Sequence, residues 1–164
     1  MSVAYVVPPE QPLPLPAALG ESEALLYEYW LDIHPGGDRL PGRQHFDPAE
    51  LGSRHPALLQ HLWLVDVERN PLRFRLRLVG SAVYMTSPFA RAGHYIDEFI
   101  DPVSRTETLQ ASFNTLVETG EPAFRRGRPH ILSSRNSRQL SRLSLPLAAD
   151  GRNVDMILNI TSRV

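Results

Sequence analysis

Apolar and charged residues alternate strictly over residues 73–79, where arginines are interleaved with Phe74, Leu76 and Leu78. Successive side chains of a strand point to opposite faces, so these three apolar residues are expected on one face and the arginines on the other. A strand with one buried and one wet face fits an antiparallel sheet. The pattern therefore predicts a strand of such a sheet.

Four further segments carry strand patterns: 61–68, 123–132, 140–148 and 154–161. An Asn-Pro turn joins the first of these to 73–79 as a hairpin, and an Asp-Gly pair is a strong hairpin signal between the last two. A glycine and a proline interrupt 123–132, which predicts an irregular edge strand.

Helical periodicity predicts a helix over residues 21–33 and a longer one that follows Asp101-Pro102 and ends at Gly120. Shorter helical segments are expected at 48–51, 56–60 and 81–86. Two strands before and three strands after a helical insert predict an α+β fold with one five-stranded antiparallel sheet.

The chain of 164 residues is expected to form a proline-rich extended arm, 1–19, and a single domain, 20–164. Its beginning has no basic segment followed by a long apolar one, and no apolar run approaches the ~20 residues of a membrane helix. A cytoplasmic protein without membrane insertion is therefore expected.

Composition excludes several kinds of chemistry. All 17 basic residues are arginine, so no lysine is available for a Schiff base or as a general base. The absence of cysteine excludes disulfides, thiolate nucleophiles and cysteine-ligated zinc. A net charge of −1 argues against a broad surface for nucleic acid.

The histidines and acidic residues form no recognisable catalytic or metal motif. None of the six histidines has another at metal-ligand spacing: His34, His45, His55, His61, His94 and His130. Asp47 is best explained as a helix cap. Asp97 and Glu98 are adjacent, so their side chains should diverge. Arg77 is expected to form ion pairs on the wet face, with an acidic ligand or partner as the alternative.

Several short motifs together resemble the PAS domain, in particular a bacterial PAS family first catalogued as a domain of unknown function. The motifs are Tyr29-Trp30, Leu40-Pro41-Gly42-Arg43 with Asp47-Pro48, Arg77-Leu78-Val79-Gly80, Gly93, Gly120-Glu121-Pro122, Leu145-Pro146-Leu147 and Asn159-Ile160-Thr161. The last motif has asparagine where PAS domains typically have aspartate. The resemblance covers about residues 24–162.

The resemblance implies a sheet in the strand order 2-1-5-4-3 with helices on one face, to which the N-terminal helix 21–33 and the proline-rich arm are added. In that order the strands 73–79 and 123–132 lie at opposite edges. Two arginine clusters are then separate, Arg73, Arg75 and Arg77 against Arg125, Arg126 and Arg128. This further weakens a nucleic-acid interpretation.

The resemblance also implies a ligand pocket between the sheet and its helices. The pocket residues expected from the sequence are Phe74, Leu76, Leu78, Tyr84, His94, Phe113, Leu145, Met156 and Leu158. Without cysteine a covalently bound flavin or coumarate is excluded. Haem is disfavoured because residues 102–119 contain no histidine, which leaves His94 as a substitute ligand. Non-covalent flavin stays open, and a filling by apolar side chains or a small metabolite is expected.

The resulting hypothesis is a stand-alone PAS-type sensory or regulatory domain of bacterial signalling. It would act by sensing a small ligand, by protein–protein interaction, or by both. Thr161 lies three residues from the end of the sequence, so output is expected through a protein partner or a homodimer. The expected dimer residues lie on the helix 21–33, which could instead simply cover the sheet: Leu26, Tyr29, Trp30 and Ile33.

The alternative hypothesis is a small α+β enzyme, such as an isomerase or hydrolase, with a curved sheet around an apolar pocket. It requires a convergent pair of catalytic groups inside the pocket, for which His94 and Asp97 are the candidates. Binding of oligonucleotides through the arginines is a third hypothesis, which the two separate clusters disfavour.

Overall fold

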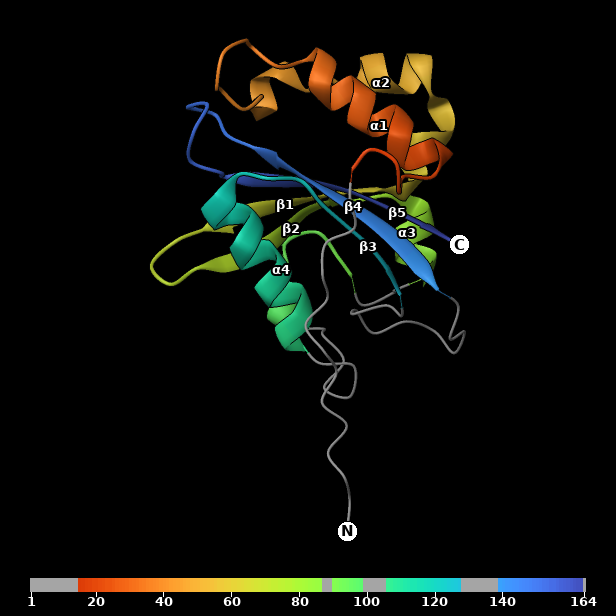
Figure 1. The fold of residues 1–164 in the computed structure, drawn as a ribbon. Helices are drawn as coiled ribbons and strands as arrows, with labels where there is room; N and C mark the ends of the chain where they lie inside the picture. Colours follow the sequence, from red (N-terminus) through yellow and green to blue (C-terminus); the bar gives the residue numbers. More distant parts are fainter. Residues whose placement is uncertain (1–14, 87–89, 99–105, 128–138, 164) are drawn as a thin grey trace.

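The computed structural model describes residues 15–86, 90–98, 106–127 and 139–163, and Figure 1 shows their arrangement. The strands are β1 (Leu62–Glu68), β2 (Arg73–Val79), β3 (Ala123–Gly127), β4 (Leu140–Leu147) and β5 (Met156–Arg163). They form one antiparallel sheet in the order β2-β1-β5-β4-β3. The expected α+β fold and strand order are thus confirmed.

The helices lie close to their expected positions. They are α1 (Glu21–Asp32), α2 (Pro48–Arg54), α3 (Ser81–Thr86) and α4 (Thr106–Thr119), with 3-10 turns η1 (Arg43–His45), η2 (Pro56–His61) and η3 (Ile96–Glu98). Asp47 caps α2, since its Oδ1 accepts a hydrogen bond from the Ala49 N–H at 2.9 Å. The first part of the arm, the expected cap at Asp101 and residues 128–132 of the expected third strand lie outside the described residues.

Helices cover both faces of the sheet. On the face called here the α1 face, α1 packs together with Leu51 of α2 and Leu58 of η2. On the opposite face, the α4 face, α4 packs with Val83 of α3 and Ile96 of η3. Figure 1 shows α1 and α2 above the sheet and α4 below it. The N-terminal helix therefore lies on the face opposite the long helix.

The central strands β4 and β5 are buried on both faces because each is covered from both sides. Strand β2 lies at one edge and alternates between buried and exposed positions. Strand β3 lies at the other edge, so Arg125 and Arg126 are remote from the arginines of β2, as expected. Arg128 is outside the described residues.

A β-bulge interrupts the alternation of β2. Leu64 pairs with Leu78, but the next residue, Val65, pairs with Leu76, so Arg77 has no residue directly opposite it. The bulge turns Leu78 onto the α1 face, where it is 43% exposed. The expectation that Leu78 shares a face with Leu76 is wrong, because alternation in a sequence does not reveal a bulge.

None of the helices among the described residues is long and apolar enough to cross a membrane.

Candidate functional site

The α4 face of the sheet carries an aromatic cluster centred on Phe113. Leu109, Phe113 and Leu116 follow one another at helical spacing, so α4 presents all three to the sheet, and each is at most 1% exposed. The ring centre of Phe113 lies 5.2 Å from that of Phe74 on β2 and 5.9 Å from that of Trp63 on β1. Aromatic contacts thus hold the helix against β1 and β2.

Two fully buried polar residues lie on the same face. Ser144 and Asn159 are register partners on β4 and β5, and neither side chain reaches solvent. The Ser144 hydroxyl donates to Asn159 Oδ1 at 2.6 Å. The Asn159 amide donates to the carbonyls of Trp63 and Ile157 at 3.4 and 3.3 Å. The side chains therefore satisfy each other and the neighbouring backbone.

Further polar groups extend this pair along the sheet. Trp63 donates its indole N–H to Thr161 Oγ1 at 2.9 Å. Arg142, the register partner of Thr161, is 7% exposed, and its guanidinium lies 5.5 Å from the centre of the Phe113 ring. Its Nη2 also donates to Ser112 Oγ of α4 at 3.4 Å. Hydrogen-bonding groups and aromatic rings thus lie side by side; Ser144, Asn159, Trp63, Thr161 and Arg142 are called the buried polar row.

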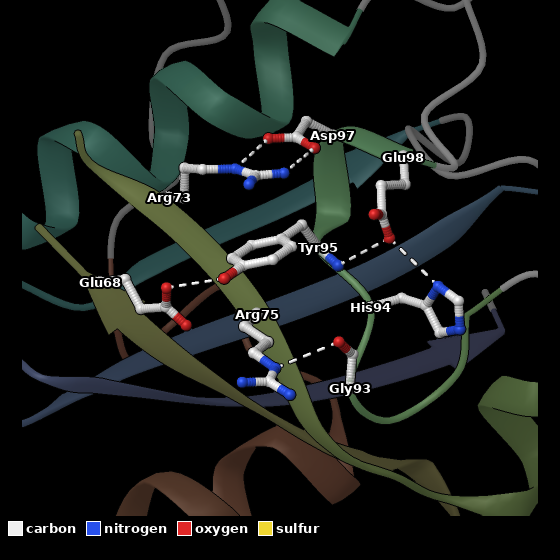
Figure 2. A network of polar contacts seen from close by, with 8 residues as sticks. All are labelled: Glu68, Arg73, Arg75, Gly93, His94, Tyr95, Asp97 and Glu98. Atoms are coloured by element: carbon white, nitrogen blue, oxygen red, sulfur yellow. Dashed lines mark hydrogen bonds and ion pairs between the residues drawn. The ribbon is translucent and has the colours of Figure 1, made fainter. Parts of the chain in front are cut away.

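A second polar cluster lies at the edge of the sheet, where residues 91–98 run beside β2 (Figure 2). This stretch is called the edge segment. Leu76 donates its N–H to the His94 carbonyl at 2.8 Å and accepts the N–H of Gly93 at 2.7 Å. Arg75 Nε donates to the Gly93 carbonyl at 3.1 Å. The edge segment therefore pairs with the outer edge of β2 through one isolated β-bridge, between Arg75 and Tyr95.

Side chains reinforce this pairing, as Figure 2 shows. Arg73 donates two hydrogen bonds to Asp97, at 3.0 and 2.9 Å, and its guanidinium lies 3.5 Å from the centre of the Tyr95 ring. Tyr95 is the bridge partner of Arg75 and donates its hydroxyl to Glu68 Oε1 at 2.8 Å. The bond to Glu68 raises the pKa of Tyr95, and the bonds to Asp97 raise the pKa of Arg73. Tyr95 thus stays protonated and Arg73 charged as the pH rises.

Comparison with known proteins finds several solved structures of similar fold, among them the following two. The PAS domain of a protein from Colwellia psychrerythraea has 13% identity and a TM-score of 0.48, over 70% of this chain and 97% of that chain. An RNA-binding light-oxygen-voltage receptor has 14% identity and a TM-score of 0.45, over 76% of this chain and 36% of that chain. No family model and no curated protein matches the sequence.

The strand order β2-β1-β5-β4-β3, with α4 against one face, is the order that the resemblance of the sequence implied. The fold is PAS-like. In a PAS-like fold the expected ligand pocket lies between α4 and the sheet, which is where the buried polar row and the Phe113 cluster are found.

The predicted pocket residues divide between the two faces. Three are buried in the cluster on the α4 face: Phe74, Leu76 and Phe113. Three others are buried on the α1 face, so their assignment to this pocket is wrong: Leu145, Met156 and Leu158. Alternate residues of a strand face opposite sides of the sheet. In β4 and β5 the more apolar of the two alternating sets was expected to face the pocket, but the set that contains Ser144 and Asn159 faces α4.

The remaining three predicted pocket residues are exposed, and their assignment is also wrong. Leu78 and Tyr84 are each 43% exposed, and the His94 side chain is 56% exposed. The bulge displaces Leu78, Tyr84 lies on the outer side of α3, and His94 belongs to the edge segment. A role of His94 as a ligand inside the PAS-like core is inconsistent with this position.

Sequence reasoning missed the buried polar row. Its members lie in strands, and none of them was among the predicted pocket residues, because one wet face is usual for an antiparallel sheet. The signal that could have found them is local: Pro146 follows Ser144 and Ile157 precedes Asn159 on the same side of the strand, so apolar residues occur on both sides of each strand. Such a pattern is typical of strands covered on both sides.

The residues expected to form a dimer surface on α1 are largely buried within the chain. Leu26, Tyr29 and Trp30 are at most 4% exposed, and Trp30 Nε1 donates to the Pro146 carbonyl of β4 at 3.0 Å. Ile33 is partly buried against the same cluster. The expectation of an exposed aromatic surface is therefore wrong. The structure agrees with the alternative, in which the helix 21–33 simply covers the sheet.

The enzyme hypothesis required His94 and Asp97 to converge inside the pocket. Instead, His94 Nδ1 lies 3.1 Å from Glu98 Oε2, and Asp97 pairs with Arg73. All of these groups lie at the sheet edge. The pair is therefore not formed. Within the described ranges there is also no group of three His, Asp or Glu side chains that could hold a metal ion.

Proposed function

We propose that this chain is a PAS-type sensory or regulatory domain of bacterial signalling that binds a small ligand between α4 and the sheet. The observation that supports the proposal most is the buried polar row. Buried polar groups must all find hydrogen-bond partners, a requirement that apolar residues do not have, so a layer that served stability alone would be expected to use apolar residues. A few polar groups among aromatic and aliphatic side chains are the usual composition of a small-molecule site.

The chemistry of the row suggests what such a ligand offers. Phe113 and Trp63 would pack against a flat apolar body, and the Ser144–Asn159 pair would exchange a hydrogen bond with its polar edge. The proposed role is binding and not catalysis.

Protein–protein interaction is the second part of the proposal. It is supported by apolar side chains that remain exposed near the junction of β2 and α3, namely Leu78, Tyr84 at 43% and Met85 at 76% exposure. Exposed apolar groups gathered at one end of a domain are typical of interaction surfaces. A partner there, or a second copy of the chain, would receive the signal.

Native mass spectrometry of the protein purified from its own host tests the ligand proposal. We expect a species heavier than the chain, because a retained ligand adds its mass. Ser112→Leu adds bulk beside Arg142 on the buried side of α4 and should abolish the additional mass. Thr115→Leu adds the same bulk on the exposed side of the helix and should retain it. Loss in both variants, or no heavier species at all, would count against a site under α4.

A further inference from the structure

We propose that the edge of β2 is a binding site for an extended peptide strand, and that the edge segment occupies this site as an intramolecular placeholder. The partner strand would carry an aromatic residue opposite Arg75, an acidic residue opposite Arg73, and an apolar residue where the edge segment has Gly93. Addition of a strand to a sheet edge is a common mode of peptide recognition, in which backbone hydrogen bonds supply affinity and alternate side chains supply specificity.

The contacts of the edge segment define what the site recognises. Tyr95 lies opposite Arg75 and stacks on the guanidinium of Arg73 at 3.5 Å, while Asp97 accepts both hydrogen bonds of that guanidinium. A guanidinium that binds a carboxylate with two hydrogen bonds and an aromatic ring with its face selects a specific pair of side chains. Aromatic and acidic residues two positions apart on an extended strand meet this requirement.

Two buried residues anchor the edge segment, Ala90 just before it and Ile96 within it, and the residues between these two make few contacts with β2. Ala90 and Ile96 are at most 1% exposed in the α4-face cluster, whereas residues 91–94 are exposed. Between these anchors only Leu76 exchanges backbone hydrogen bonds with it among those described. The Arg73–Asp97 pair is 37% and 41% exposed, and exposed ion pairs contribute little to stability. Local opening of residues 91–94 therefore leaves the core in place, whereas a partner that replaces Tyr95 and Asp97 also takes the position of Ile96.

The edge segment leaves part of the site uncovered. Gly93 adopts φ +92°, and the backbone pairing with β2 reaches no further than Leu76. Leu78 lies two residues beyond that point and is 43% exposed. In the register of the Arg75–Tyr95 bridge, a regular strand that continued past Leu76 would place its residue 93 opposite Arg77 and beside Leu78, so an apolar residue there would cover part of Leu78. This additional burial is what would allow a partner to displace the placeholder.

The inference rests on the interaction part of the proposed function and concerns the exposed edge of β2, not the contacts between α4 and the buried polar row. Failure of the peptide experiment would leave the ligand proposal standing, because that proposal is tested by bound mass and not by peptide affinity.

Binding of two labelled peptides to the full chain, followed by fluorescence anisotropy, tests the site. Both peptides have the blocked sequence of residues 90–98, and one carries Gly93→Leu. We expect the leucine peptide to bind and the glycine peptide to bind about tenfold more weakly, since it cannot cover Leu78. In the protein, Leu78→Ser should remove this difference by weakening the leucine peptide alone. Equal affinity for the two peptides, or for a scrambled leucine peptide, would overturn the proposal.

Substitutions in the edge segment should have the opposite effect and raise the affinity for the leucine peptide. Asp97→Ala removes the intramolecular partner of Arg73, so it should strengthen binding of the leucine peptide at least about threefold through weaker competition. Tyr95→Phe, which loses only the bond to Glu68, is the milder second variant and should act in the same direction. Arg54→Ala breaks the exposed pair with Glu50 on α2 and should change nothing. Unchanged or weaker binding in both placeholder variants would also overturn the proposal.

Discussion

The side-chain amide of Asn159 fits its buried position better than a carboxylate would. Its Oδ1 accepts from Ser144 and its Nδ2 donates to two carbonyls, while the side chain has no exposure to solvent. A carboxylate could only accept, and it would bring a buried charge next to those carbonyls. Asparagine therefore suits this buried position better than the aspartate of the motif that it resembles.

The Ser144–Asn159 pair predicts a non-additive response to mutation. Ser144→Ala leaves Asn159 Oδ1 without its donor and should lower the free energy of unfolding by about 1–3 kcal/mol. Replacing both partners, as Ser144→Ala with Asn159→Leu, should cost less than the sum of the two single changes, because no polar atom is then left unpaired. Urea unfolding of the four proteins measures the coupling, and strict additivity would contradict it.

Asp150 predicts a dependence of stability on pH. It accepts hydrogen bonds from the backbone N–H of Arg152 and from the backbone and side chain of Asn153, which lower its pKa from 3.8 to about 2. Because the folded state has the lower pKa, the ionised group contributes stability that is fully present above the unfolded pKa and is lost as the pH falls through about 2.

Asp150→Ala should therefore be less stable than the parent protein at pH 5, and the difference should shrink as the pH falls toward 2. Urea midpoints at pH 5, 4, 3 and 2 measure it. A difference that stays constant over this range would show that the carboxylate charge contributes nothing to the turn.

At the scale of elements, the strands could be predicted from alternation and their order from the PAS resemblance, but their faces could not. In β5 both phases are apolar enough to be buried, so the sequence does not distinguish Ile157 on the α4 face from Leu158 on the α1 face. The bulge at Arg77 and the pairing of the edge segment with β2 depend on backbone geometry that no local pattern encodes. The candidate site was consequently predicted only in part.

The bulge in β2 predicts different costs for two leucines that look equivalent in the sequence. Leu76→Ala removes a core side chain with 1% exposure and should cost about 2–5 kcal/mol. Leu78→Ala changes a side chain with 43% exposure and should cost less than about 1 kcal/mol. Equal losses in chemical denaturation would mean that the strand is regular.

The burial of α1 predicts a loss of stability without a change of mass. Trp30→Ala leaves a cavity in the α1-face cluster and an unpaired carbonyl at Pro146, and should cost about 3–5 kcal/mol. Leu31→Ala, at the adjacent position with 47% exposure, is the matched control and should be nearly neutral. Light scattering should give the parent mass for both variants; a change of mass in Trp30→Ala alone would restore a dimer role for the helix.

For the molecule as a whole, the central strands form the common wall of two separate cores. Residues of β4 face the α1 cluster and the α4 cluster in turn, so Leu145 contacts one core and Ser144 the other. A displacement of the β4 backbone that originates in one core must therefore also move side chains in the other core. This geometry would link the proposed ligand under α4 to α1, which lies on the opposite face of the sheet.

The two tryptophans of the chain stand on opposite sides of that wall, Trp30 in the α1 cluster and Trp63 beside Phe113 in the α4 cluster. The domain thus carries one tryptophan in each of its cores. In Trp30→Phe the tryptophan emission would come only from the α4 face, where the ligand is proposed to bind, and in Trp63→Phe only from the α1 face. A compound that altered the emission of both single-tryptophan proteins would make the transmission across the sheet directly visible by optical spectroscopy.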